Sequence, residues 1–252
     1  MSELATAVFA AERGEHLVDA PRSRRYDAFR RSFDEDAYRR DLASRGLAWV
    51  SRDDPGFPAR LSTIHDPPVG LFVRGAPPEL DDLPAIAIVG ARACSTYGSS
   101  VAHDLARGLA AAGAVVVSGL ARGIDACAHR GALERGTTVA VLGCGIDRDY
   151  PRAHTALAAQ VVAAGSIVSE YAPGVEPAPW RFPARNRIVA GLTQATLVVE
   201  ARERSGALIT ADLALDEGRE VLAVPGEITS EMSPCGQTPP RGGGPSRTRG
   251  HA

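Results

Sequence analysis

The sequence predicts an α/β protein with a doubly wound, mostly parallel sheet and a small N-terminal extension. Three observations support this fold: short apolar runs recur along residues 85–232, helical patterns separate them, and glycine-rich turns join the two. Parallel strands are buried on both faces, so continuous apolar runs fit them better than alternating patterns. Six such strands are expected, at 86–89, 114–117, 137–142, 166–169, 195–200 and 219–224.

Residues 86–125 form the first strand–helix–strand unit. Ser95 is an N-cap candidate for the helix, and Gly113 closes it. One helical face is expected to carry Val101, Leu105 and Leu109, with alanines at 102, 106 and 110 beside them. The unit is a right-handed crossover between two parallel strands, so both of its glycine turns should lie on the sheet edge where open α/β sheets bind ligands.

The remaining pattern divides the chain into three parts. Residues 1–84 are expected to form a short helical and proline-rich extension, residues 85–232 the main domain, and residues 233–252 a disordered, atypical tail. The extension should hold one helix near 34–45 and short strands at 47–50 and 70–73. In the main domain, further helices are expected at 124–135, 153–164, 188–192 and 205–217.

Composition limits the classes of function. The net charge is −2, and all 28 basic residues are arginine, so any nucleic-acid site must be a local arginine patch on a nearly neutral body. No signal peptide and no membrane-spanning apolar run is found in the sequence. The four cysteines have neither disulfide-framework nor zinc spacing, which favours reduced thiols and a cytoplasmic location.

The turns at the predicted ligand edge carry a series of arginines. Glycines let a backbone approach a ligand closely, and helix N-termini offer N–H groups suited to phosphate. The simpler interpretation is that the glycines only make tight turns and that the arginines are solvated. Since five turns share one edge, we favour polyanion binding by a cationic ring of Arg92, Arg122, Arg152, Arg185 and Arg187.

Other chemistries have weaker support. The GxGxxG fingerprint of dinucleotide sites is absent, so no dinucleotide cofactor is expected. The acids Asp125, Asp147, Glu170 and Glu200 fall on the same edge without metal-ligand spacing, and no metal site or catalytic residue is predicted. His129 and His154 are assigned structural roles. Trp180 and Phe182 could stack on unpaired bases or cover the sheet edge as core, and the core role is favoured for Phe182.

Six segments together resemble the DNA-processing protein A family, DprA, also called Smf. They are VGARACSTYG, SGLARGIDACAH, LGCGIDRDYP, IVSEYAPG, FPARNRIVAGL and VVEARERSGALITADLALDEGREVLAVPG. The resemblance implies an extended Rossmann-like fold and a protein without enzymatic activity that binds single-stranded DNA. It further implies protection of incoming DNA and loading of the recombinase RecA during natural transformation and recombination, with self-association as a homodimer.

The resemblance also implies which residues touch DNA. The matching positions are Arg92, Ser95, Gly119, Arg122, Arg152, Arg185, Asn186 and Arg187. From about Pro234 the chain leaves the family's pattern, which suggests a truncation or a frameshift. The alternative function is a Rossmann-like nucleotide phosphate hydrolase similar to the LOG family. That family carries a PGGxGTxxE signature, where this chain has EARERSGALIT.

Overall fold

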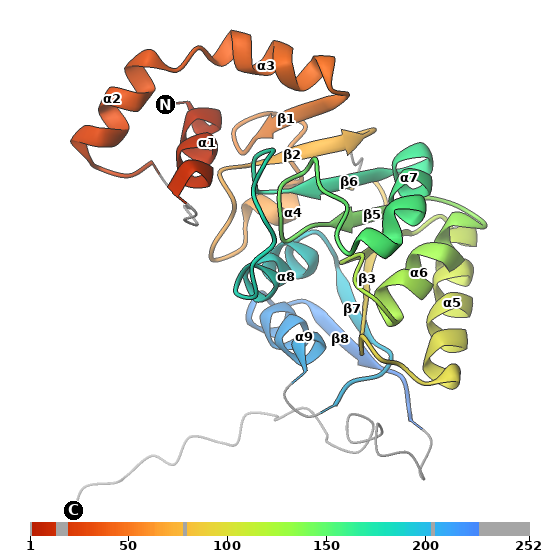
Figure 1. Cartoon of the computed structure of the whole chain (residues 1–252). Coiled ribbons are helices and arrows are strands. Elements are labelled where there is room, and N and C mark those ends of the chain that lie inside the picture. The colour runs from red at the N-terminus through yellow and green to blue at the C-terminus, as the bar shows by residue number, and fades with distance from the viewer. Residues whose placement is uncertain (1, 14–19, 78–79, 203–204, 227–252) are drawn as a thin grey trace, which may run out of the picture.

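The computed structural model describes residues 2–13, 20–77, 80–202 and 205–226, which form one eight-stranded sheet flanked by helices (Figure 1). The strand order is β1-β2-β6-β5-β4-β3-β7-β8. The strands are β1 (Leu47–Ser51), β2 (Gly70–Gly75), β3 (Ala85–Val89), β4 (Val115–Ser118), β5 (Thr138–Val141), β6 (Ser166–Ser169), β7 (Ala195–Val198) and β8 (Glu220–Ala223). The helices are α1 (Glu3–Arg13), α2 (Arg24–Ser32), α3 (Glu35–Ser44), α4 (Ala59–Ser62), α5 (Thr96–Ala111), α6 (Ile124–Leu133), α7 (Thr155–Ala164), α8 (Arg181–Gly191) and α9 (Gly206–Asp216).

The six strands from β3 to β8 are all parallel, so the predicted doubly wound sheet is confirmed. From β3 the chain moves outward through β4, β5 and β6, and then returns to place β7 on the other side of β3. The carboxyl ends of β3 and β7 therefore flank a point where the winding direction reverses. Such a switch point opens a crevice in α/β sheets.

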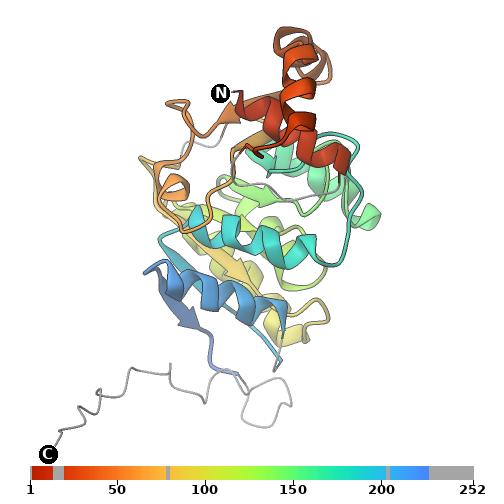
Figure 2. The same cartoon turned by 90° about the vertical axis from the view of Figure 1, so that its left-hand side faces the viewer.

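Helices cover both faces of the sheet. On one face α4, α8 and α9 pack over alternate residues of the strands, including Ala87, Val117 and Val141 (Figure 2). The other face is covered by α5 and α6 over Ile88 and Val116, and by α7 nearer β5 and β6. The long apolar runs of the strands are explained by this burial on two sides.

The N-terminal extension continues the same sheet. The strands predicted at 47–50 and 70–73 are present as β1 and β2, and β2 pairs antiparallel with β6, with Phe72 opposite Ser169. Trp49 and Phe72 pack with ring centroids 4.5 Å apart. The sheet thus crosses the boundary expected at residues 84/85, because strand pairing completes the open edge of β6.

Helices α1 and α2 were not expected from the sequence, whereas the helix predicted near residues 34–45 is present as α3. Asp34 caps α3 by accepting a hydrogen bond from the backbone N–H of Ala37 at 2.9 Å. The predicted tail at 233–252 lies outside the described residues. None of the described helices has the length and apolar character needed to cross a bilayer.

Helix α8 begins earlier than the sequence suggested. A helix was expected only from Ile188, after a proline-rich loop, but α8 starts at Arg181. Pro183 stands in the first turn, where a backbone N–H has no partner within the helix, so the proline does not interrupt it. As a result the side chains of the segment Arg185–Arg187 are displayed by a helix rather than by a loop.

The predicted apolar side of α5 packs inward, with the exception of Leu105. Ala102, Ala106 and Ala110 are buried, whereas Leu105 is 38% exposed. Small side chains are needed on this face because α5 and α6 pack closely: a Cβ on Gly131 of α6 would clash with the carbonyl oxygen of His103 in α5. The alanines therefore form the close contact, and Val101 and Leu109 are partly buried against the same core cluster.

The close contact between α5 and α6 can be tested with Gly131→Ala. The added methyl group has no room, so the free energy of unfolding should fall by about 1–3 kcal/mol in a denaturant titration. Gly108→Ala in α5 is the matched control, because a Cβ there meets nothing within 4 Å. That variant should be as stable as the parent or more stable by about 0.5–1 kcal/mol. Equal stability of the two variants would contradict the packing.

Candidate nucleic-acid interface

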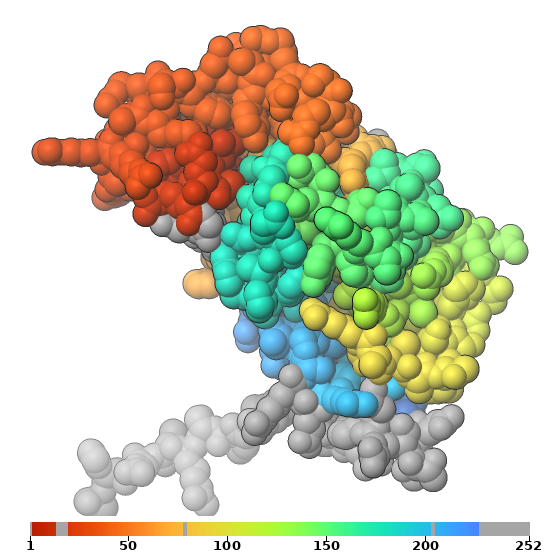
Figure 3. Space-filling view, in the orientation of Figure 1, coloured from red at the N-terminus to blue at the C-terminus, as the bar shows by residue number. Residues whose placement is uncertain are grey.

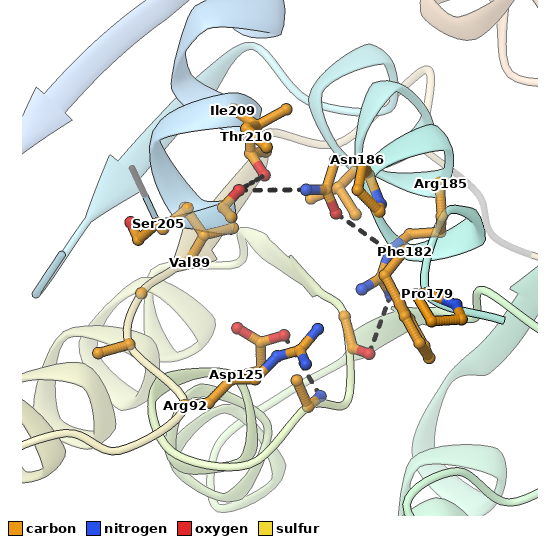
Figure 4. A pocket seen from close by; sticks show the side chains of 18 of the residues that line it. Val89, Arg92, Asp125, Pro179, Phe182, Arg185, Asn186, Ser205, Ile209 and Thr210 are labelled. Atoms are coloured by element: carbon orange, nitrogen blue, oxygen red, sulfur yellow. Dashed lines mark hydrogen bonds between the residues drawn. The ribbon is translucent and has the colours of Figure 1, made fainter. Parts of the chain in front are cut away.

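A pocket of about 620 Å³ opens at the switch point between β3 and β7 (Figure 4). Its wall combines the turn after β3, the segment after β4, and the N-terminal parts of α8 and α9. A second hollow of about 460 Å³ adjoins it. The two share Arg92, Gly119, Ala121, Tyr150, Phe182 and Arg185 in their walls. We refer to the two together as the switch-point pocket.

Two glycine turns are packed backbone against backbone at the floor of this pocket. The N–H of Ile124 donates a hydrogen bond to the carbonyl oxygen of Ala91 at 3.2 Å. Gly123 has a φ of +74°, and a Cβ there would lie 2.7 Å from the carbonyl oxygen of Arg92. Only glycine allows both this conformation and this approach. The contact sets the positions of Arg92 and Arg122, which flank it.

Arg92 and Arg122 are exposed and line the pocket. The guanidinium carbon of Arg92 lies 5.3 Å from the centre of the Phe182 ring, within cation–π distance. Phe182 in turn stacks on Tyr150, with centroids 5.3 Å apart and planes inclined by 26°. Phe182 therefore lies in the pocket wall, which corrects the expectation that it covers the sheet edge as core.

Arg185 lines the same pocket but is only 4% exposed. Its Nη1 donates to the carbonyl oxygen of Gly119 at 2.9 Å and to that of Val141. A Cβ on Gly119 would lie 2.6 Å from that Nη1, so the glycine makes room for the guanidinium. The turn motif shows the glycine, but nothing in the local sequence indicates that its partner is a buried arginine.

Arg185 and Asp125 form a buried pair of charges. Burial raises the pKa of Asp125, although the positive charge of Arg185 opposes that shift. Burial likewise lowers the pKa of Arg185, and Asp125 opposes the shift. Asp125 also accepts a hydrogen bond from the N–H of Ala121 at 3.3 Å. The two charges compensate each other, so Arg185 is held in the pocket wall by Asp125 and by carbonyl oxygens.

Asn186 and Ser205 complete the wall on the side of α9. Asn186 accepts from Nε of Arg185 at 3.3 Å and donates to the carbonyl oxygen of Gly206 at 3.1 Å, which links α8 to α9. The Oγ of Ser205 is buried in the pocket wall and has no hydrogen-bond partner in the described part of the chain. The sequence analysis placed Ser205 only at the start of the helix expected at 205–217 and missed it as a site residue; its place just before α9 was the available signal.

Ser95 is committed to a protein carboxylate. It caps α5 as predicted, accepting from the N–H of Gly98 at 2.9 Å. Its own N–H and Oγ, however, both donate to Oε2 of Glu200, at 3.0 and 3.1 Å. The anion position at the N-terminus of α5 is thus filled by Glu200, and Ser95 is absent from the pocket wall.

Arg187 is also held by the protein. It is buried and forms two hydrogen bonds with Glu170, at 2.9 and 2.7 Å, and one with the carboxylate of Asp66 at 3.1 Å. It does not belong to the pocket wall, so the structure separates it from the cationic ring in which it was expected. Arg152 is exposed next to Pro151, a wall residue, but is itself outside the wall.

The acids at this edge have structural partners. Asp147 pairs with Arg45 at 3.1 Å, while Glu170 and Glu200 are engaged as described above. No group of three potential metal ligands occurs among the described residues. His129 shares a hydrogen bond with Thr138 at 2.8 Å, and His154 with the carbonyl oxygen of Leu120 at 2.9 Å. These contacts fit the structural roles that were assigned to both histidines.

Comparison with known proteins gives a consistent set of relatives. The sequence model of a family described as DNA recombination-mediator protein A matches residues 48–239. DNA processing protein DprA of Streptococcus pneumoniae is 46% identical over 183 residues, which cover 71% of this chain and 64% of that protein. Protein Smf of Escherichia coli K12 is 45% identical over 183 residues, or 71% of this chain and 48% of that protein. The chain therefore spans between about half and just under two thirds of these relatives.

Two solved structures share the fold. The X-ray structure of DprA from Streptococcus pneumoniae matches with a TM-score of 0.75 and 36% identity, over 92% of this chain and 84% of that chain. DNA processing protein A from Helicobacter pylori matches with a TM-score of 0.67 and 30% identity, over 73% of this chain and 82% of that chain. The latter structure gives insight into the single-stranded DNA binding mode of the Helicobacter pylori protein.

The role of Glu200 can be tested by Glu200→Ala. This change leaves the N–H and Oγ of Ser95 without their acceptor, and the free energy of unfolding should fall by about 1–3 kcal/mol in a denaturant titration. Glu200→Gln keeps one acceptor oxygen, so its free energy of unfolding should fall by less than that of Glu200→Ala. Glu220→Ala, at an exposed position on β8, controls for loss of an acid and should stay within about 0.5 kcal/mol of the parent. A Glu200→Ala protein as stable as the parent would contradict this role.

Proposed function

Because this chain belongs to the DNA recombination-mediator protein A family, whose members include DprA and Smf, we propose that it binds single-stranded DNA in the switch-point pocket. One observation carries the proposal: Arg92, Arg122 and Arg185 come from three separate segments and converge on the wall of one hollow. The single-stranded DNA binding mode of the Helicobacter pylori relative supports the choice of ligand.

The pocket offers a phosphodiester strand two kinds of contact. Arginine guanidinium groups form charge-assisted hydrogen bonds with phosphate oxygens, and their binding releases counterions. The stacked rings of Phe182 and Tyr150 provide an aromatic surface for an unpaired base, a contact worth about 1–3 kcal/mol. A duplex is stiff and keeps its bases paired, so it cannot bend into a hollow of this size. The expected preference is therefore for single strands.

The wider role follows the family and is part of the same proposal. In this role the protein protects incoming single strands and loads RecA recombinase on them, acts in the cytoplasm, and self-associates as a homodimer without catalysing a reaction. Since the chain spans only part of its relatives, the switch-point pocket supports DNA binding directly, whereas the RecA and dimer contacts rest on the family alone.

The hydrolase alternative has less support from the pocket. Asp125 is the one acid among the described residues of the wall, and its carboxylate already accepts a hydrogen bond from the N–H of Ala121 and interacts electrostatically with Arg185. Release of free base from nucleoside monophosphates incubated with the protein would favour the hydrolase and count against the DNA-binding proposal.

Arg92→Ala tests the pocket as the DNA site. This exposed side chain does not hold the fold, so the variant should remain folded. It should bind a single-stranded oligonucleotide about tenfold more weakly in a gel shift, because it can no longer make a charge-assisted hydrogen bond to phosphate. Arg107→Ala is the matched control, because Arg107 is exposed further along α5 and pairs with Asp104 at 3.2 Å. It should bind like the parent. Unchanged binding by Arg92→Ala, or equal affinity for duplex and single strand, would refute the assignment.

A further inference from the structure

Helix α2 and its lead-in carry a concentration of positive charge that the switch-point pocket does not use. Residues 22–32 hold five arginines and a single acid, Asp27. All five are exposed, and no ion pair joins any of them to an acid in the described part of the chain. They are Arg22, Arg24, Arg25, Arg30 and Arg31. We call this set the α2 arginine surface.

Several other surface arginines of this protein are neutralised by neighbours. Arg39 pairs with Glu35 at 2.9 Å, and Arg148 pairs with Glu176 at 2.8 Å. The whole chain has a net charge of −2, so a group of five exposed positive charges is a strong local departure from the average. Guanidinium groups at this density repel one another and attract an extended polyanion.

The helix that displays these arginines is firmly held. Ser23 caps it by accepting from the N–H of Tyr26 at 3.1 Å, and the buried Tyr26 hydroxyl shares a hydrogen bond with Thr6 of α1 at 2.7 Å. Phe29 packs against Phe9 of α1, with ring centroids 5.4 Å apart. One side of α2 is thus fixed to α1 by aromatic contacts, and the arginines occupy the rest of its circumference.

Helix α2 and a segment that leads to the switch-point pocket are both visible on one face of the molecule. Figure 3 shows the red and orange N-terminal helices on the same face as the teal segment near residues 170–182, which leads to the pocket. This segment carries Trp180, which is 46% exposed, and it ends at Phe182 in the pocket wall. A strand that leaves the pocket beside α8 can therefore follow this face toward α2.

We propose that the α2 arginine surface is a second binding surface for the phosphate backbone of single-stranded DNA, engaged by the part of a strand that extends beyond the switch-point pocket. The inference rests on the proposed function for its ligand. The surface offers phosphate contacts without base readout, because exposed guanidinium groups attract the backbone of any sequence. It adds affinity only for strands long enough to reach it.

The experiment compares two oligothymidylates of about 6 and about 30 nucleotides, because single-strand sites commonly hold about 4–16 nucleotides. Fluorescence anisotropy at several salt concentrations gives affinity and its salt dependence. The test variant is Arg24→Gln with Arg31→Gln, which lie seven residues apart and share a helical face. Arg130→Gln with Arg135→Gln removes the same charge from exposed positions toward the far end of α6. Arg24→Lys with Arg31→Lys keeps the charge.

For the long strand, the Arg24→Gln/Arg31→Gln protein should bind about three- to tenfold more weakly. Its salt slope should be shallower by about 1.4, because each of the two phosphates that is no longer neutralised reduces the slope by about 0.7. Affinity for the short strand should stay within about twofold of the parent, and the lysine variant and the α6 control should retain their affinity for the long strand.

An unchanged affinity and slope of the Arg24→Gln/Arg31→Gln protein for the long strand would overturn the inference, as would an equal reduction in the α6 control. If the Arg24→Gln/Arg31→Gln protein loses binding to phosphatidylserine vesicles but keeps its affinity for DNA, then α2 is a membrane-binding surface and the inference is also refuted. Failure of the pocket proposal gives a different result, because the Arg92→Ala protein then binds the short strand with the affinity of the parent. The α2 arginine surface is in that case tested only by the affinity of the Arg24→Gln/Arg31→Gln protein for the long strand.

Discussion

The contact between the turn after β3 and the turn before α6 determines where the cationic side chains of this protein lie. Ala91 and Ile124 are joined by a backbone hydrogen bond of 3.2 Å, and Gly123 leaves no space for a side chain between the two segments. Because the strands that precede these turns are neighbours in a parallel sheet, the turns meet at one edge. Arg92 and Arg122 are therefore brought to the same edge of the sheet. A side chain between the two turns would hold the turns, and with them these two arginines, further apart.

Within this frame the three convergent arginines have different roles. Arg185 is buried and fixed by carbonyl oxygens and by the charge of Asp125, so it has a structural role in the pocket wall. Arg92 is exposed and rests on the ring of Phe182, and Arg122 is exposed at the rim. The buried arginine fixes the shape of the wall, while the exposed arginines can adjust to the path of a flexible strand.

Much of the fold could be predicted from the sequence, since apolar runs and glycine turns report local structure. The site was predicted less completely, because pairing between distant residues leaves no local pattern. Arg92, Gly119, Arg122, Arg185 and Asn186 do line the pocket. Ser95 and Arg187 do not, because Glu200 and Glu170 engage them across the fold. Phe182 was assigned to the core, but it lies in the pocket wall.

The most direct test of the central claim is photo-crosslinking of the protein to a single-stranded oligonucleotide that carries 5-iodouracil, followed by mass spectrometry of the linked peptides. If the strand lies in the switch-point pocket, the main crosslinks should map to Tyr150 and Phe182, whose rings stack in its wall. They should weaken in the Arg92→Ala protein. Crosslinks confined to peptides that contain neither aromatic residue, with none in the pocket wall, would contradict the account.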